Sequence, residues 1–377
     1  MLKCNFSCNY CVAAAGQTQV SGTDYSKGGK RNVWGIENGR QNVRTAIEWA
    51  ASLPYRVGVR YDVHGEPLLN ADVIEDITWL SQQENVDFVE IQTNGSLFKR
   101  RLPKLAEKID VKKLKLFCTF HHKEISIDDY MENVIFAQEA GFDATVNTLL
   151  SEENVSIIKE ALERCKAKGI PTSGDLLFPG FDVPVTEKVS EEIDVDKRAR
   201  HFLSHDPFKH LEEAGPRGRE VFDVVADSGP LGKEIRFLAA LLVGLYGKPG
   251  RSCSAGHDYI IVDNWGDVYP CTSYADVQMG KLGSVLTPGF VPKLREETYA
   301  PCQYKETCHQ KEEYGNLRIL REHRDLTHQT LNNFSGGDKE VDVDQLVQGR
   351  LAMIEMAREN FELHGAPGKQ ACSNSCE

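Results

Sequence analysis

The chain has 377 residues, of which 41% are hydrophobic and 27% charged, as is typical of two or three folded domains and not of a disordered chain. No apolar run approaches the roughly 18 residues of a membrane helix, and the N-terminus lacks a signal-peptide pattern, so we expect a cytoplasmic protein without a membrane segment. The formal net charge of −12 disfavours nucleic acid as a partner, because phosphate recognition needs a basic surface.

Residues 36–178 alternate between segments with apolar residues at helical spacing and short apolar runs that are typical of buried strands. Strands that alternate with helices predict right-handed βαβ units and a parallel sheet. We therefore expect an α/β fold, either a partial or complete barrel or a doubly wound sheet, and a sixth strand could lie at the N-terminus. In chain order, the predicted elements are helix 42–53, strand 57–63, helix 71–83, strand 86–92, helix 102–109, strand 113–120, helix 129–140, strand 143–150, helix 153–168 and strand 172–178.

The chain changes character after this alternating part. Residues 179–232 are rich in Pro, Gly and mixed charge, which predicts a connecting region. Residues 258–271 predict a β-hairpin with its turn at Asn264-Trp265-Gly266. The predicted domains are a core at 1–180, a connecting helical region at 181–250 and a small cysteine-rich domain at 251–377.

The eleven cysteines indicate metal ligation and not disulfide bonds. An odd number cannot all pair, and disulfides are rare in the reducing cytoplasm. Three cysteines lie within the first eleven residues and six lie after residue 250, as expected for two separate groups of thiolate ligands. The other two, Cys118 and Cys165, fall in a predicted strand and a predicted helix and are expected to be small core residues.

The first group, Cys4, Cys8 and Cys11, has the spacing C-x3-C-x2-C. Three thiolates fit three corners of a [4Fe–4S] cluster and leave the fourth iron open to a non-protein ligand. A structural zinc ion is the alternative, but residues 1–20 contain no fourth Cys and no His to complete its coordination. The spacing therefore favours an iron–sulfur cluster.

This motif, with the aromatic Tyr10 before its third cysteine, resembles that of the radical S-adenosylmethionine (radical SAM) enzymes. The resemblance implies an α/β fold that is a partial (β/α)6 barrel, followed by a small α+β auxiliary-cluster domain. It also implies that SAM binds the open iron and is cleaved to methionine and a 5′-deoxyadenosyl radical. The electron would come from an external one-electron reductant such as flavodoxin or ferredoxin.

Two further motifs follow predicted strands and carry the resemblance along the chain. Gly65-Glu66-Pro67, preceded by His64, resembles the Gly-Gly-Glu-Pro motif that receives the amino group of SAM, with His64 in place of the first Gly. Thr93-Asn94-Gly95 resembles a loop near the methionine end of SAM. A tight hairpin turn is the alternative for this second motif, but a predicted helix follows it in place of an antiparallel strand.

Polar residues of two later strands complete the candidate site. Thr119 and Asn147 are implied by the resemblance to contact SAM, although Asn147 could equally pair with another core polar group. His121 and His122 follow strand 113–120 and could contact substrate or relay protons, or could be ordinary loop histidines.

The later cysteines are similar in arrangement to the SPASM and twitch extensions of radical SAM enzymes, which carry auxiliary [4Fe–4S] clusters. The similarity rests on the pattern C-x2-G … G-x4-C that includes Cys253 and Cys271. Two clusters with four thiolates each need more than the six cysteines present, and Tyr299 and Glu312 stand where the family pattern has cysteines. The favoured arrangement is one auxiliary cluster on Cys253, Cys271, Cys302 and Cys308; the alternatives are completion of a cluster by Cys372 or Cys376, a second cluster with non-Cys ligands, and a structural zinc ion.

Three functions are open at this stage. The first is hydrogen abstraction, with net oxidation assisted by an auxiliary cluster, on a small molecule such as a sugar or aminocyclitol in natural-product biosynthesis. It is favoured because no leader-binding domain precedes Cys4, whereas many peptide-modifying relatives have one. The second is maturation of a ribosomal peptide or protein by crosslinking, epimerisation or thioether formation. The third, a non-enzymatic iron–sulfur or zinc scaffold, does not account for the motifs at Glu66, Asn94 and Asn147.

The metal content of the anaerobically purified and reconstituted protein tests the prediction that the cysteines bind iron–sulfur clusters. We expect about eight irons per chain for one auxiliary cluster and about twelve for two, because each cubane holds four. Elemental analysis measures both iron and zinc, and stoichiometric zinc in place of iron would contradict the iron–sulfur prediction.

Overall fold

The structure is a computed structural model that describes part of the chain. The described residues are 4–8, 39–63, 65–150, 153–176, 252–263, 265–276 and 279–302. The expectations for the connecting region 181–250 lie outside the described residues, as do those for His64, Tyr10, Cys11, Cys308, Cys372 and Cys376.

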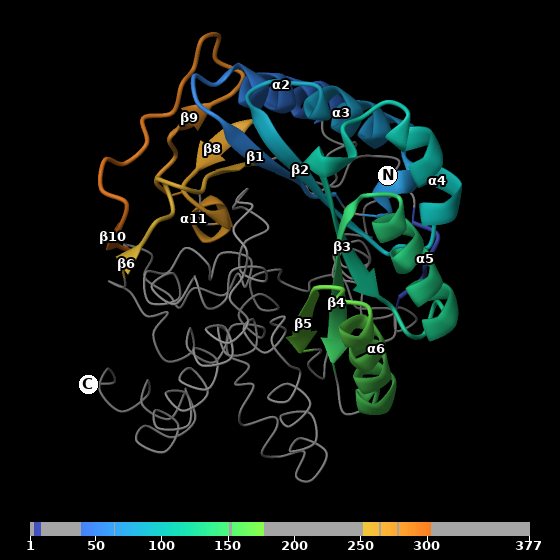
Figure 1. Ribbon diagram of the computed structural model, residues 1–377. Helices are drawn as coiled ribbons and strands as arrows, with labels where there is room; N and C mark the ends of the chain where they lie inside the picture. The colour runs from blue at the N-terminus through green and yellow to red at the C-terminus, as the bar shows by residue number, and fades with distance from the viewer. Residues whose placement is uncertain are drawn as a thin grey trace, which may run out of the picture.

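A five-stranded parallel sheet forms the core, and its spatial order β1-β2-β3-β4-β5 follows the chain. In Figure 1 the sheet is curved and the helices lie along its outer side. This sequential order is that of a barrel, since a doubly wound sheet reverses its strand order at a switch point. The α/β prediction is therefore confirmed, and the proposed N-terminal sixth strand lies outside the described residues. The bounds are α2 Gly39–Ser52, β1 Val57–Tyr61, α3 Ala71–Ser81, β2 Val86–Thr93, α4 Phe98–Ala106, β3 Leu114–Phe120, α5 Ile127–Glu139, β4 Asp143–Leu150, α6 Val155–Ala167 and β5 Thr172–Leu176.

The largest boundary error concerns α4, predicted at 102–109 and found at Phe98–Ala106. Phe98 and Leu102 are fully buried and Leu105 is nearly so, which places them on one helical face. The basic run Lys99-Arg100-Arg101 between the first two apolar positions concealed the helix start, because its side chains occupy the other faces.

The two faces of the sheet differ in polarity. Residues of the helix-covered face, among them Ile91 and Leu116, belong to the main hydrophobic core. Because side chains alternate between the two faces along a strand, the residue directly before each of these core residues points to the inner face. There a row of alternating charge crosses four neighbouring strands in register, and its members are Arg60, Glu90, Lys115 and Asp143. Nitrogen–oxygen distances are 3.5 Å for Arg60–Glu90 and 3.8 Å for Lys115–Asp143.

A small antiparallel sheet of β7, β8 and β9 packs against α2 (Figure 1). Its β7–β8 pair confirms the hairpin predicted at 258–271, and its turn depends on Gly266, whose φ is +81°. Trp49 of α2 donates its indole N–H to the Phe290 carbonyl at 2.8 Å and stacks on the Phe290 ring. The bounds are β6 Ser252–Cys253, β7 Ile261–Val262, β8 Asp267–Tyr269, α11 Thr272–Asp276, β9 Gly283–Ser284 and β10 Ala300–Pro301.

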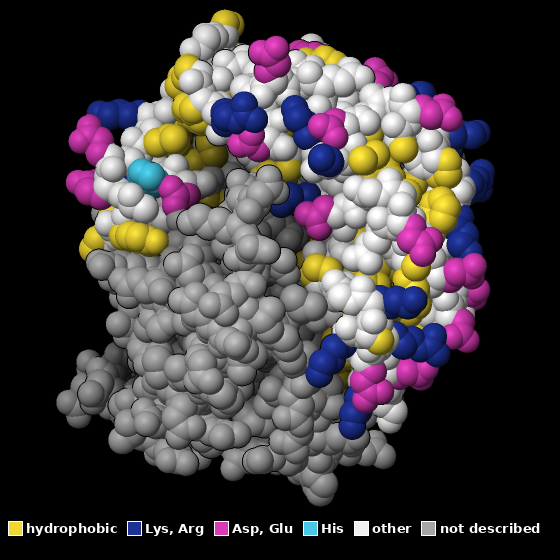
Figure 2. All heavy atoms as spheres, in the orientation of Figure 1, with side chains coloured by type: hydrophobic (Ala, Val, Ile, Leu, Met, Phe, Trp, Pro, Cys, Tyr) yellow, Lys and Arg dark blue, Asp and Glu magenta, His cyan; other side chains and the backbone are white. Residues whose placement is uncertain are grey.

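The surface of the outer helices carries side chains of both charges (Figure 2). On the face drawn in Figure 2, basic and acidic side chains are interspersed over the outer helices. Among the described residues, the helices are too short or too polar to cross a membrane.

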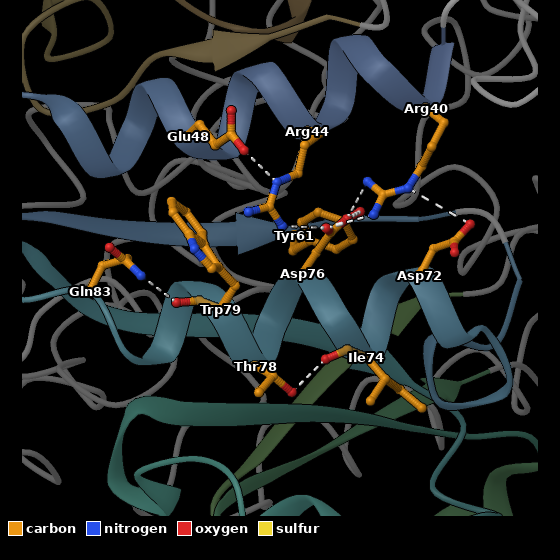
Figure 3. Close-up of polar contacts among 10 residues, drawn as sticks. All are labelled: Arg40, Arg44, Glu48, Tyr61, Asp72, Ile74, Asp76, Thr78, Trp79 and Gln83. Atoms are coloured by element: carbon orange, nitrogen blue, oxygen red, sulfur yellow. Dashed lines mark hydrogen bonds and ion pairs between the residues drawn. The ribbon is translucent and has the colours of Figure 1, made fainter.

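A buried carboxylate connects the first two helices to the first strand. Asp76 of α3 is fully buried and accepts two hydrogen bonds from the Arg40 guanidinium at 2.7 and 2.8 Å. Tyr61 of β1 donates its hydroxyl to the same carboxylate at 2.8 Å, and Arg44 lies 3.5 Å away (Figure 3). Burial and the neighbouring carboxylate raise the pKa of Tyr61 far above its usual value. The network therefore holds α2, α3 and β1 together through one acidic side chain.

Asp76→Asn should lower the free energy of unfolding by about 2 kcal/mol, because it leaves Arg40 and Arg44 without their buried counter-charge. Denaturant titration followed by circular dichroism measures the change. Asp72→Asn is the matched control: Asp72 lies 3.7 Å from Arg40 but is 61% exposed, so its loss should cost about 0.5 kcal/mol or less. Equal effects of the two substitutions would contradict the role given to Asp76.

Candidate functional site

The predicted cofactor residues gather at the carboxyl ends of neighbouring parallel strands. Gly65-Glu66-Pro67 follows β1, and Thr93-Asn94 ends β2 and begins the next loop. Thr119 of β3 lies directly opposite Asn147 of β4 in the ladder. The carboxyl ends of parallel strands are where α/β folds build their ligand sites. The topology therefore brings these residues to one edge of the sheet, as the sequence predicted.

Glu66 connects the loops that follow β1 and β2. Its Oε1 accepts hydrogen bonds from the Thr93 hydroxyl at 2.8 Å and from the Leu68 backbone N–H at 3.1 Å. Its Oε2 accepts one from the Asn94 backbone N–H at 2.8 Å. Burial raises the pKa of Glu66, while the hydrogen bonds from Asn94, Thr93 and Leu68 act in the opposite direction. Three donors aimed at one carboxylate fit its ionised, acceptor-only form.

The carboxylate of Glu66 faces the protein interior, since the residue is only 1% exposed. A direct contact between this carboxylate and the amino group of SAM stays a prediction. What the structure shows is a brace that fixes the backbone on either side of it. Gly65, immediately before Glu66, has a φ of +112°, a conformation that side-chain-bearing residues rarely adopt. The hydrogen bonds of Glu66 and the positive φ of Gly65 both indicate that the backbone of this loop adopts one defined conformation.

The N-terminal cysteine segment is attached to the β2 loop by amide and hydroxyl groups. Asn94 donates its Nδ2 to Oδ1 of Asn5 at 3.1 Å, and Asn5 donates its own Nδ2 to the Ser96 hydroxyl at 2.9 Å. Asn94 Oδ1 accepts from both the backbone N–H and the hydroxyl of Ser96, at 3.0 and 2.6 Å. These three side chains close a ring of hydrogen bonds. It places the segment that carries Cys4 and Cys8 beside the carboxyl end of β2.

Asn5 and Ser96 were not singled out from the sequence. Asn5 lies between two cysteines of the motif and Ser96 directly follows Thr93-Asn94-Gly95. Their position inside or next to motif residues is the only sequence signal, and their mutual contact spans 91 positions in the chain. A contact of that separation follows from the fold and not from local pattern.

A second attachment joins the cysteine segment to the end of β3. The Cys8 Sγ lies 3.4 Å from Nδ1 of His121, and the Phe6 ring meets the His121 ring edge-on with centroids 5.9 Å apart. Burial, with the neighbouring His122, lowers the pKa of His121 to about 4. His122 turns elsewhere: its Nδ1 lies 3.3 Å from the Asn154 amide nitrogen. The side chains of the two adjacent histidines therefore point toward different neighbours.

The described cysteines of the first motif suit an iron–sulfur cluster in chemistry and position. Cys4 is exposed and Cys8 half-buried, both on the segment held beside β2 and β3. Soft thiolate ligands are the ones that iron–sulfur clusters take. Within the described ranges, which exclude Cys11, Cys, His, Asp and Glu side chains do not converge in threes to form a metal site. The ligand set of the first motif therefore stays a prediction that the placement supports.

The later cysteines are only partly brought together. β6 and β10 pair antiparallel with Cys253 opposite Ala300, which places Cys302 two residues beyond that pair. Arg295 donates to the Cys253 carbonyl at 2.6 Å and holds this turn. Cys271 follows β8 and is buried. Because these cysteines do not form a threefold set among the described residues, the auxiliary ligands also stay a prediction.

Cys118 and Cys165 are both fully buried in the main core, as expected for small apolar residues. Burial raises the pKa of Cys118 well above its usual value, which keeps it a thiol. Cys165 packs its sulfur 3.9 Å from that of Met131.

Comparison with known proteins found relatives that match part of the chain. No protein-family model matches the chain. A protein named GTP 3′,8-cyclase from Staphylococcus carnosus is 24% identical over 160 residues, which are 40% of this chain and 44% of that protein. Its namesake from Aquifex aeolicus is 27% identical over 156 residues, 39% of this chain and 45% of the relative. The match thus spans less than half the length of these curated relatives.

The cysteine motif, the parallel α/β core and these relatives together support a radical SAM superfamily enzyme. Solved structures of native anSMEcpe with bound AdoMet and a peptide align with 96% of the chain at 13% identity. Their TM-scores are 0.41 and 0.42, values too low to establish a common overall fold.

Glu66→Gln should reduce the free energy of unfolding by about 2 kcal/mol, because an amide would turn an N–H toward groups that already donate. Denaturant titration measures the loss. Glu75→Gln is the control, since Glu75 lies exposed on α3 and should change stability by less than about 0.5 kcal/mol. A Glu66→Gln variant as stable as the control would show that the carboxylate does not brace the two loops.

Proposed function

We propose that the protein is a radical SAM enzyme whose cluster is held by Cys4, Cys8 and Cys11. The observation that carries this proposal is the double attachment of the cysteine segment to the sheet edge. The segment is bound to Asn94 at the end of β2 and contacts His121 at the end of β3. When bound, the cluster and SAM would supply a 5′-deoxyadenosyl radical, a reaction that the cofactor pair carries and the protein positions.

Further residues that are predicted to contact SAM lie at the same edge of the sheet. Glu66 braces the loops after β1 and β2, and Gly65, which has no side chain, leaves backbone groups there to meet an amino or carboxylate group. Thr119 and Asn147 face each other across β3 and β4 near their carboxyl ends, and both carry hydrogen-bonding side chains suited to a ribose or carboxylate. We assign these four residues to cofactor binding.

The substrate is proposed to lie over the inner face of the sheet. That face carries the charged row and, further toward the carboxyl ends, Thr119 and Asn147, whereas the helix-covered face is apolar. Enclosing a radical in such a site protects it from water and side reactions. We propose a small-molecule substrate, such as a sugar or aminocyclitol, because the curated relatives bear the name of an enzyme acting on a nucleotide and not on a peptide.

Net oxidation of the substrate is the proposed outcome, with an auxiliary cluster on the later cysteines as electron acceptor. The antiparallel pairing of β6 with β10 supports a second metal group, because it places Cys253 opposite Ala300, two residues before Cys302 in the chain. The proposed electron donor for the first cluster is an external one-electron reductant such as flavodoxin or ferredoxin.

Simultaneous replacement of Cys4, Cys8 and Cys11 by Ala should abolish 5′-deoxyadenosine formation from SAM in the presence of dithionite, because the open iron is lost. Chromatography of the reaction mixture measures the nucleoside. Cys165→Ala is the matched control, since it removes a buried thiol of the core and should leave SAM cleavage within about twofold. SAM cleavage that survives the triple substitution would overturn the proposed function.

A further inference from the structure

His121 has a contact that the predicted roles of substrate binding or proton relay do not explain. Its Nδ1 lies 3.4 Å from the Cys8 sulfur, within the range of a hydrogen bond to sulfur. In the tautomer that carries a proton on Nδ1, this nitrogen donates to the sulfur. The contact joins residues 113 positions apart, so it is a product of the fold.

Contacts to both the ring and the backbone of His121 restrict this residue. Phe6, two residues before Cys8, meets the ring edge-on. The His121 carbonyl accepts hydrogen bonds from the Glu124 N–H at 2.9 Å and the Ile125 N–H at 3.2 Å, which fixes the turn that follows β3. A ring held by packing and by its own backbone presents a defined nitrogen to the sulfur.

Hydrogen bonds to a ligating thiolate change the properties of an iron–sulfur cluster. An N–H that points at the sulfur withdraws electron density from it and stabilises the reduced state, so the reduction potential rises. Groups of this kind also orient the ligand. The neighbouring His122 instead directs its Nδ1 toward the Asn154 amide.

We propose that His121 is a positioning residue that donates an N–H···S hydrogen bond to Cys8 and raises the reduction potential of the first cluster. The proposal rests on the proposed function, because it takes Cys8 as a cluster ligand. It assigns His121 to the cluster and not to substrate chemistry.

The test measures the midpoint potential of the first cluster by electron paramagnetic resonance during a redox titration of the full chain. The signal of the triple Cys4, Cys8 and Cys11 to Ala variant is subtracted to remove auxiliary contributions. His121→Leu should shift the midpoint to more negative values, because it removes the donor. His121→Asn should restore it toward the wild-type value, since the Asn amide N–H occupies nearly the place of Nδ1.

His122→Leu is the matched control and should leave the midpoint unchanged. Loss of iron from His121→Leu with full retention in His121→Asn would support the same hydrogen bond. A wild-type midpoint in an iron-replete His121→Leu variant would overturn the proposal while leaving the proposed function intact. Absence of any iron that depends on Cys4, Cys8 and Cys11 in the wild-type protein would instead overturn the proposed function and this inference with it.

Discussion

The candidate site depends on one buried carboxylate. Glu66 is almost completely withdrawn from solvent, and an ionised acid in such a place is tolerated only when hydrogen bonds replace its hydration. Here three donors do so, and they come from the carboxyl end of β2 with its following loop and from the segment after β1. Those loops cannot move apart without leaving a buried charge unsatisfied. The geometry of the sheet edge is therefore set by an electrostatic requirement and not by packing alone.

The position of the cysteine segment also depends on the hydrogen bonds of Glu66. Asn94 donates its backbone N–H to Glu66, and its side chain forms hydrogen bonds with Asn5 and Ser96. This one residue therefore links the sheet edge to the N-terminal segment. His121 adds a second point of contact from the next strand. Two contacts on different strands restrict a short segment that has no regular structure of its own over residues 4–8.

Local patterns predicted the alternating strands and helices, the hairpin near the later cysteines and the placement of the motifs at strand ends. They did not predict that Glu66 would face inward, that Asn5 would bind Ser96, or that Asp76 would gather Arg40 and Tyr61. Each of these contacts joins residues from different elements, and periodicity carries no information about such partners. The start of α4 was missed for a different reason, since a run of basic residues interrupts its apolar face.

The row of alternating charge on the inner face has a consequence for folding. Arg60, Glu90, Lys115 and Asp143 are in-register neighbours, and residues of the adjacent row are apolar core side chains. A slip of any one strand by a single residue would exchange its two faces, placing a charge in the core and an apolar side chain in the row. Parallel strands pair over long chain separations and are slow to find their partners. The charges thus penalise misaligned intermediates and favour a single alignment of the strands as the sheet assembles.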